Sequence, residues 1–445
     1  MTDRILSVGI DLGTTTTQMI VSRLQVENTA AAFSVPRMEI RTREIAYRGG
    51  IHFTPLLSAD TIDAEAIRSL IAAEYAKAEI TPKSVQTGAV IITGETARKE
   101  NAREVLAALK EFAGDFVVAT AGPALESVLA ARGAGADRAA KERGRYVLHM
   151  DIGGGTSNLA LFDPDGKLAD TGCLNVGGRL LKFDDRRQVT YVSPVLRGMD
   201  VSDPQHLAKE LAEVLEQAAG LRPTGERLRH FITDKTVQLP NEPVLLSFSG
   251  GVADLIDREE PDPMRYGDLG VYLGRAIRAS RLCAGDYLLG RETIRATVIG
   301  AGSYATELSG STISYTGVEF PLQNLPVERL QEVTAGEIQK KLSLHPGEPT
   351  ALSLEGTASP TFDELSRLAE QIARGVEPLS QPLVVAVEQD MAKALGQALQ
   401  LRLGSRVPLI CLDGIYAPEG SYLDIAAPVA GGAAVPVIVK TLAFE

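Results

Sequence analysis

The sequence predicts an α/β fold in which one strand-turn-strand unit occurs twice and a further α/β region follows. The first unit is VGIDLGTTTTQMIV, from Val8 to Val21, and the second is LHMDIGGGTSNLALF, which begins at Leu148. Around both units, apolar strand segments alternate with amphipathic helical segments, as in a mixed sheet covered by helices. A repeated unit on this background predicts two lobes of the same architecture.

The first unit has the composition of a phosphate-binding turn. Asp11 closes an apolar strand, and Gly13 allows the backbone to approach a ligand closely. Thr14, Thr15 and the two threonines that follow offer amide N–H groups and hydroxyls in succession. A carboxylate at the strand end suits Mg2+. Because aspartate, glycine and threonine also form ordinary β-turns, this unit alone leaves both interpretations open.

The second unit repeats the arrangement of the first. Asp151 ends a strand, Gly153, Gly154 and Gly155 form the turn, and Thr156 leads into the next apolar strand. Each unit thus places a carboxylate and a row of hydrogen-bond donors at one strand end. In a duplicated fold the two units would face each other around one polyphosphate and its metal ion.

The two units resemble the first and second phosphate motifs of the ATPase superfamily that includes actin, sugar kinases and heat-shock chaperones. PVLLSFSGGVADLI, from Pro243, resembles the adenosine motif of that superfamily, with Ser249, Gly250 and Gly251 after a buried strand. Glycines there would let the adenine and the ribose lie against the backbone. A strand-to-helix turn without a ligand is the alternative interpretation of this segment.

Two further segments resemble the helices that connect the two halves in this superfamily. AGPALESVLAARGAG, from Ala121, resembles the first, and YGDLGVYLGRAI, from Tyr266, resembles the second. Heat-shock chaperones have an acidic residue before the proline of the first helix, whereas this chain has Gly122 before Pro123. The identity of the carboxylate that orients the attacking water therefore stays open, and slow hydrolysis would be consistent with Gly122.

The resemblance implies an actin-like ATPase fold, with two ribonuclease-H-like lobes and a nucleotide cleft between them. It implies ATP and Mg2+ as cofactors, with Asp11 and Asp151 as the metal ligands and the candidate catalytic residues. The phosphates would be held by Gly13 to Thr15 on one side and by Gly153 to Thr156 on the other.

We expect three units along the chain: a first ATPase lobe at 1–140, a second lobe with the adenosine motif at 141–285, and a C-terminal α/β region at 286–445. Residues 133–144, rich in glycine, alanine and charged side chains, are expected to be a linker. ATVIGAGSYATELSGSTISY, from Ala296, is predicted to form a strand, a glycine turn and a strand. Because the last unit carries no chemical motif of its own, we hypothesise an interaction role for it.

Three other features have two interpretations each. TGETARKEN, from Thr93, follows a strand, where ligands commonly bind in α/β folds, but a threonine followed by acidic residues also caps a helix. Gly177 and Gly178 would either approach the nucleotide or form a β-bulge. Asp413, a single acid at a strand end, is more often a backbone cap than a catalytic group.

Composition restricts the class of partner and the compartment. The chain has 445 residues and a formal net charge of −12, which argues against nucleic acid or an anionic membrane as the main partner. It has no apolar run of about eighteen residues, and the N-terminus enters the first strand without a signal-peptide pattern, so we expect a cytoplasmic protein. Cys173, Cys283 and Cys411 lack metal-ligand spacing and are predicted to be buried free thiols.

Four segments together resemble the family of ethanolamine ammonia-lyase reactivating factors, and the resemblance runs over essentially the whole chain. These segments are TGETARKEN, LNVGGRLL, YGDLGVYLGRAI and the ending from GSYLDIAAP to PVIVKTLAF. The resemblance implies an ATP-dependent, chaperone-like factor that releases damaged cobalamin from the lyase so that intact adenosylcobalamin can bind. The five histidines include no DxHxxG-type cobalamin motif, as expected of a protein that opens the cobalamin site of a partner.

Two other functions are alternatives. A small-molecule kinase of the sugar-kinase type would use the same cleft, but it needs a second pocket with a carboxylate for the hydroxyl proton, and the sequence has no distinctive acceptor-site motif. An actin-like scaffold that polymerises with ATP is the other alternative. The sequence leaves open the oligomeric state, with a homodimer as one option, the surface that contacts the lyase, and any association with a bacterial microcompartment.

Overall fold

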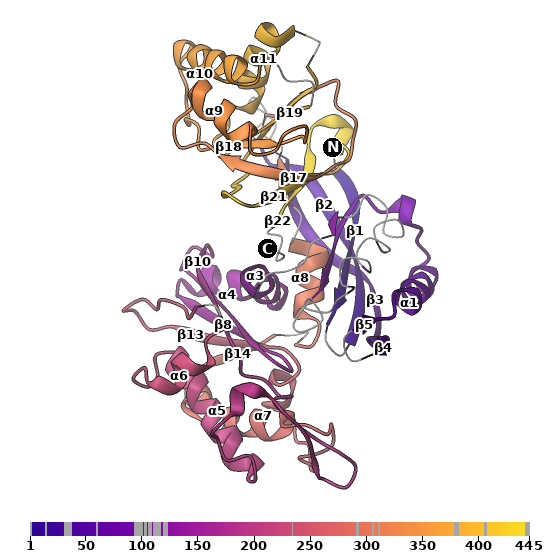
Figure 1. The fold of residues 1–445 in the computed structure, drawn as a ribbon, viewed down its shortest axis with the longest axis vertical. Coiled ribbons are helices and arrows are strands. Elements are labelled where there is room, and N and C mark those ends of the chain that lie inside the picture. Colours follow the sequence, from indigo (N-terminus) through magenta and orange to yellow (C-terminus); the bar gives the residue numbers. More distant parts are fainter. Residues whose placement is uncertain are drawn as a thin grey trace.

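The computed structural model contains three large sheets, one in each ATPase-like lobe and one in the C-terminal region (Figure 1). The structure describes residues 2–13, 16–30, 38–58, 61–92, 101, 105, 109, 117–118, 123–233, 235–290, 293–304, 307–309, 312–377, 382–404 and 407–440.

The first lobe is a five-stranded sheet with the order β3-β2-β1-β6-β7. β1, β2 and β3 are antiparallel, whereas β6 and β7 run parallel to β1. The strands of this lobe are β1 (Thr2–Leu12), β2 (Thr16–Asn28), β3 (Met38–Phe53), β4 (Leu56–Ser58), β5 (Thr61–Ile62), β6 (Thr87–Ile92) and β7 (Val117–Val118). α1 (Ala64–Lys77), which Asp63 caps, covers one face of the sheet.

The second lobe repeats this topology, with the sheet order β10-β9-β8-β13-β14 and the same strand directions. Its strands are β8 (Val147–Ile152), β9 (Ser157–Phe162), β10 (Leu168–Leu174), β13 (Leu245–Ser249) and β14 (Tyr287–Leu289), with the hairpin of β11 (Leu181–Phe183) and β12 (Val189–Val192) beside them. The prediction of two duplicated lobes in an actin-like fold is confirmed.

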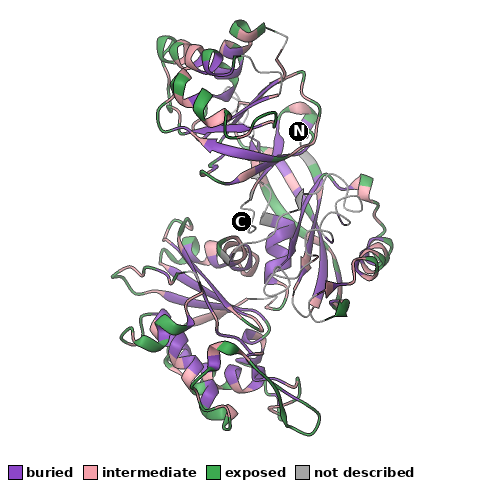
Figure 2. Cartoon of the chain, in the orientation of Figure 1, coloured by how far each residue is buried: buried purple, intermediate pink, exposed green. Residues whose placement is uncertain are grey.

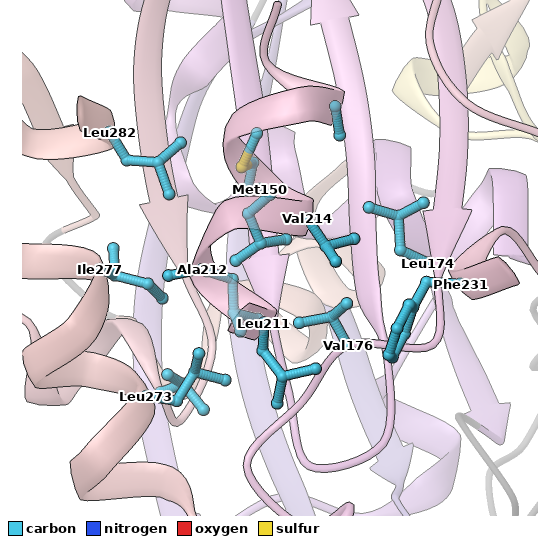
Figure 3. Packing of buried hydrophobic residues seen from close by; sticks show 14 of the residues in the cluster. Met150, Leu174, Val176, Leu211, Ala212, Val214, Phe231, Leu273, Ile277 and Leu282 are labelled. Carbon is cyan, nitrogen blue, oxygen red and sulfur yellow. The ribbon is translucent and has the colours of Figure 1, made fainter. Parts of the chain in front are cut away.

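Helices cover both faces of the second sheet. α5 (Pro204–Ala218), α6 (Glu226–Phe231) and α7 (Gly270–Arg278) pack on one face, where Leu211 and Ile277 lie among the side chains that surround Met150 (Figure 3). Residues of α3 (Pro123–Ala134) and α4 (Ala136–Arg143) pack on the opposite face, against Ala160 and Phe162. β8 is therefore buried on both sides, which explains its continuous apolar composition.

Two helices, α3 (Pro123–Ala134) and α8 (Ala296–Tyr304), lie side by side between the lobes (Figure 1). α3 packs on the second sheet and α8 on the first, where Val298 contacts Ile20. The two helices approach each other closely, because an added Cβ at Gly133 would lie 1.9 Å from the Ala296 carbonyl oxygen.

Three sequence predictions about this region are wrong. The first part of the segment from Ala296, Ala296–Tyr304, is a helix and not a strand, because it is buried between two lobes and so lacks the polar stripe of an amphipathic helix; strands follow only at Glu307–Ser309 and Ser314–Thr316. YGDLGVYLGRAI, from Tyr266, forms α7, which packs on α5, so the second connecting helix is α8. Within 133–144, α4 forms a helix between Gly135 and Gly144 in place of a linker.

The C-terminal region is an eight-stranded mixed sheet with three helices. Its strands, in the order β15-β22-β21-β17-β18-β19-β20-β16, are β15 (Glu307–Ser309), β16 (Ser314–Thr316), β17 (Leu322–Arg329), β18 (Ala351–Leu354), β19 (Leu383–Val387), β20 (Leu409–Asp413), β21 (Tyr422–Ile425) and β22 (Val435–Lys440). α9 (Ala335–Leu342), α10 (Phe362–Gly375) and α11 (Ala392–Leu403) pack their apolar sides into one core with β18, β19 and β20. This region is an ordered domain with its own core.

The long strands of the first lobe also contact the C-terminal region. Ile5 and Leu24, near the far ends of β1 and β2, pack with Ala430 and Ala434 in a buried cluster. Figure 2 shows buried residues continuing along these strands toward the third sheet. The first lobe is thus joined to the C-terminal region by an apolar contact as well as by the chain.

Two composition-based expectations can be compared with the structure. Cys173, Cys283 and Cys411 are buried, as predicted, and are not joined in disulfides. In the part of the chain that the structure describes, no helix has the length and apolarity needed to cross a membrane.

Candidate functional site

The two predicted phosphate turns have the same backbone geometry. The amide of Gly13 donates to the Thr16 carbonyl at 2.9 Å, and the amide of Gly153 donates to the Thr156 carbonyl at 2.9 Å. Asp11 pairs with Gln18 across the first hairpin as Asp151 pairs with Asn158 across the second. The duplication predicted from sequence therefore holds residue by residue. Thr14 and Thr15 lie outside the described residues.

Asp151 is nearly buried, with 7% of its surface exposed. The Ser249 hydroxyl donates to Asp151 Oδ1, and the Thr297 hydroxyl donates to Oδ2 at 3.5 Å. Burial raises the pKa of Asp151 to about 6, although these two hydrogen bonds act in the opposite direction. The carboxylate is thus desolvated, held in place and suited to a cation.

The first turn is held by a threonine that sequence reasoning missed. The hydroxyl of Thr54, just beyond β3, donates to the Gly13 carbonyl at 2.7 Å and lies 3.2 Å from the Thr17 hydroxyl. Thr54 is 37 residues from Thr17 in the chain and belongs to no recognisable motif. Only the pairing of β2 with β3 places it at the turn.

The segment that resembles an adenosine motif lies directly against the second phosphate turn. Gly250 has a φ of 93°, and an added Cβ would lie 2.3 Å from the Ile152 carbonyl oxygen. The amide of Val252 donates to the same oxygen at 3.1 Å. A Cβ added at Gly251, or at Gly155, would meet no atom within 4 Å. These glycines leave open space beside the hairpin, which fits a bound nucleotide.

Gly177 and Gly178 pack on the second turn. The amide of Gly178 donates to the Gly153 carbonyl at 3.0 Å, and a Cβ at Gly177 would lie 2.3 Å from the Gly154 carbonyl oxygen. The amide of Arg179 also donates to Gly154, at 2.6 Å. Gly177 and Gly178 therefore contact the backbone of the turn itself, and their approach to a nucleotide stays a prediction.

A short segment before α8, residues 293–297, contacts the motifs of both lobes. In the second lobe, the Thr293 carbonyl accepts from the Gly250 amide at 2.9 Å, and Thr297 reaches Asp151 as described above. In the first lobe, Gln18 donates to the Ile294 carbonyl at 3.4 Å. Arg295 also donates to the Gly49 carbonyl, at 3.2 Å. This segment connects the two hairpins and the Ser-Gly-Gly turn; the sequence analysis singled out only its part from Ala296, and as a strand.

Two other candidates have structural roles or lie outside the described residues. Asp413 accepts hydrogen bonds from Ser309 and Thr312, which confirms it as a backbone cap. Of TGETARKEN only Asn101 is described, and it bonds the backbone of Ile62 through both amide atoms. A cavity of about 480 Å³ between α5 and α7 is lined by none of the predicted site residues, so it is not part of the candidate site.

Comparison with known proteins identifies the family. The model of the ethanolamine utilisation protein EutA family matches residues 3–445. The chain belongs to the EutA family. It is 40% identical over 470 residues to the ethanolamine ammonia-lyase reactivase EutA of Salmonella typhimurium, covering 100% of this chain and 99% of that protein. It is 39% identical to the EutA reactivase of Escherichia coli, with the same coverage.

Solved structures resemble part of this EutA-family chain. The ethanolamine utilization protein EutJ from Carboxydothermus hydrogenoformans covers 67% of this chain and 89% of its own length, with 16% identity and a TM-score of 0.33. A Ppx/GppA family member from Aquifex aeolicus covers 67% and 97%, with 12% identity and a TM-score of 0.42.

Proposed function

We propose that this protein is an ATP-dependent reactivating factor for ethanolamine ammonia-lyase, which releases damaged cobalamin so that intact adenosylcobalamin can bind. Full-length similarity to two proteins named as reactivases of this lyase supports the partner. The single structural observation that supports ATP is the pair of equivalent hairpins, with Asp11 and Asp151 at matching positions and the Gly250 turn against the second hairpin.

The donor set fits a polyphosphate with Mg2+. Gly13, Thr14 and Thr15 would hold the phosphates from the first lobe, and residues 153–156 would hold them from the second. Carboxylates are the protein ligands that Mg2+ prefers, and Asp11 and Asp151 stand at the two strand ends. A bound Mg2+ would supply neutralisation of the charge that develops on the phosphoryl group.

The chain's own residues would perform three tasks in hydrolysis. The amide rows of the two turns orient the terminal phosphate. Gly250 packs against the second turn, and Gly251 leaves room for the nucleoside next to Ser249. One of the two aspartates orients the attacking water. The segment 293–297 contacts both lobes. Loss of the terminal phosphate would therefore change how the two lobes are held together at this segment. A tenfold difference in lyase affinity between the two nucleotide states corresponds to about 1.4 kcal/mol.

Three units are proposed to divide this work: 1–140 and 141–285 bind the nucleotide, and 286–445 interacts with the partner. Within the last range, α8 packs on the first lobe, so the partner-binding part begins with β15. A cytoplasmic location, a homodimeric state and association with a microcompartment stay predictions. Cell fractionation and light scattering on the purified protein test them.

The deciding experiment is recovery of activity. Ethanolamine ammonia-lyase inactivated by a bound, non-functional cobalamin is incubated with this protein, Mg-ATP and free adenosylcobalamin, beside the Asp11→Ala variant. Recovery with the wild type and not with the variant is expected. Without recovery, consumption of ATP only on addition of a small alcohol or sugar would favour a kinase, and nucleotide-dependent sedimentation would favour a scaffold.

A further inference from the structure

A line of polar side chains runs through the second sheet behind Asp151. His149 precedes Asp151 by two residues on β8, and the adjacent parallel strand β13 places Ser247 beside His149 and Ser249 beside Asp151. His149 Nδ1 lies 3.0 Å from the Ser247 hydroxyl oxygen, and Nε2 lies 2.8 Å from the Ser249 hydroxyl oxygen. The imidazole is completely buried. The four side chains thus form one continuous hydrogen-bonded row.

The chemistry of the ionised carboxylate gives this row a direction. A carboxylate only accepts, so the Ser249 proton goes to Asp151 Oδ1. Ser249 must then accept from the Nε2–H of His149, which leaves Nδ1 to accept from Ser247. A neutral imidazole carries one ring proton, so one of its nitrogens donates and the other accepts. Each hydrogen bond in the row therefore has a defined donor and acceptor, running from Ser247 through His149 and Ser249 to the Asp151 carboxylate.

The equivalent row is missing from the first lobe, so the fold itself does not require it. The residue two before Asp11 is Gly9, which the strand pairing places beside Ala89, and Asp11 itself is placed beside Ile91. Gly9, Ala89 and Ile91 have no polar side-chain group. α8 occupies the corresponding space, because a Cβ at Gly9 would lie 2.4 Å from the Val298 carbonyl oxygen. The two aspartates are therefore supported differently.

The row is buried among apolar side chains, where polar groups lower the stability of the fold unless they are hydrogen-bonded. On the same face of β8 and its neighbours lie Val147, Ala160, Phe162 and Leu245, all buried in one apolar cluster. Buried hydroxyls and a buried imidazole would be replaced there by aliphatic side chains if packing alone mattered. A fully satisfied buried network instead rigidifies the groups that it joins.

We propose that Ser247, His149 and Ser249 form a positioning chain that fixes the Asp151 carboxylate for the Mg2+-bound nucleotide. This inference rests on the proposed nucleotide site. His149 is a positioning residue and does not touch the ligand; it acts through Ser249. The chain holds Oδ1 from within the second lobe, while Thr297 of α8 contacts Oδ2. Asp151 is thereby held at both of its carboxylate oxygens.

The test compares Mg-ADP and metal-free ADP binding by titration calorimetry on the full-length protein. His149→Phe keeps the ring but removes both nitrogens, and His149→Gln restores a donor at the far end of the side chain. For His149→Phe we expect Kd for Mg-ADP to rise about tenfold, because the buried Ser249 hydroxyl loses the donor that orients it toward Asp151. We expect Kd for ADP in EDTA to change less than about twofold, and His149→Gln to recover most of the Mg-ADP affinity.

A second pair of variants keeps the test decisive if His149→Phe does not fold. Ser247→Ala interrupts the row at its far end, and Ser7→Ala is the matched control. Ser7 is a buried strand serine whose hydroxyl has no hydrogen-bond partner among the described residues. We expect weaker Mg-ADP binding for Ser247→Ala only. Equal losses with and without Mg2+, or an unchanged Mg-ADP affinity in folded Ser247→Ala, would overturn the proposal. Absence of nucleotide binding by the wild type would instead contradict the proposed ATP site.

Discussion

Among single residues, Gly250 and Gly251 are adjacent but differ in what a side chain would meet. Gly250 holds a left-handed conformation against the Ile152 carbonyl, whereas Gly251 faces open space. We expect Gly250→Ala to lower the free energy of unfolding by about 1–3 kcal/mol. Gly251→Ala should unfold like the wild type but bind Mg-ADP more weakly, because its methyl group enters the space of the nucleotide. Urea unfolding and nucleotide titration on both variants check this, and equal stability of the two would contradict it.

Glu74 makes the stability of the first lobe depend on pH. Its carboxylate is 1% exposed on α1 and accepts from Lys77, Tyr47, His52 and the amide of Gly50. Burial alone would raise the pKa of Glu74, but the hydrogen bonds from these four groups outweigh it and lower the pKa to about 2. The carboxylate is therefore bound less tightly by protons in the folded state than in the unfolded chain.

Because the pKa of Glu74 is lowered by folding, its contribution to the free energy of unfolding decreases as the pH falls. Glu74 contributes stability that is fully present above the unfolded pKa near 4.5 and is lost as the pH falls toward 2. For Glu74→Gln we expect a loss on the order of 3 kcal/mol at pH 7 that becomes smaller below about pH 4. Denaturant unfolding across this range measures it, with Glu65→Gln, exposed on the same helix, as control. A loss that is constant with pH would exclude this account.

Among the elements, the crossing of α3 and α8 depends on glycine. A Cβ at Gly300 would lie 2.0 Å from the Leu129 carbonyl oxygen, so the helices must separate to admit one. Gly300→Ala should destabilise the protein by about 1–3 kcal/mol and slow ATP turnover, because Thr297 on the same helix would move away from Asp151. Gly336→Ala in α9, where a Cβ meets nothing within 4 Å, should be neutral or stabilising by about 0.5–1 kcal/mol. Thermal unfolding of both variants shows whether the loss comes from the close packing of α3 on α8 or from replacing a glycine in any helix.

The elements also show why the sequence predicted some parts of the site and not others. Both hairpins and the Ser-Gly-Gly turn were predictable, because a strand and its turn are local and their residue types are distinctive. α8 was not, since a helix buried on all sides shows no 3.6-residue periodicity. Thr54 and residues 293–297 reach the site only through strand pairing and helix packing. His149 carried a signal that could have been used, namely a polar side chain in an otherwise apolar strand.

For the whole molecule, the proposed site predicts where a nucleotide changes the protein. Mg-ATP should slow hydrogen exchange at the amides of both hairpins and of residues 293–297, because a ligand held from both lobes suppresses their separation. The helices α9, α10 and α11 belong to a separate core and should exchange at unchanged rates. Exchange followed by mass spectrometry with and without Mg-ATP measures both regions. Protection confined to the C-terminal helices would place the nucleotide elsewhere.

The contact between the long strands of the first lobe and the C-terminal region has a further consequence. Ile5, packed on Ala430 and Ala434, is six residues from Asp11 along β1, which is about 20 Å of continuous strand. A stiff antiparallel ribbon therefore joins the proposed nucleotide site to the third sheet, and the first lobe and the C-terminal region should move as one body. The second lobe would then swing against this single body, with one large internal degree of freedom instead of two. A structural change caused by phosphate hydrolysis would then reach a partner as a change in one angle, that between the second lobe and the rest of the molecule.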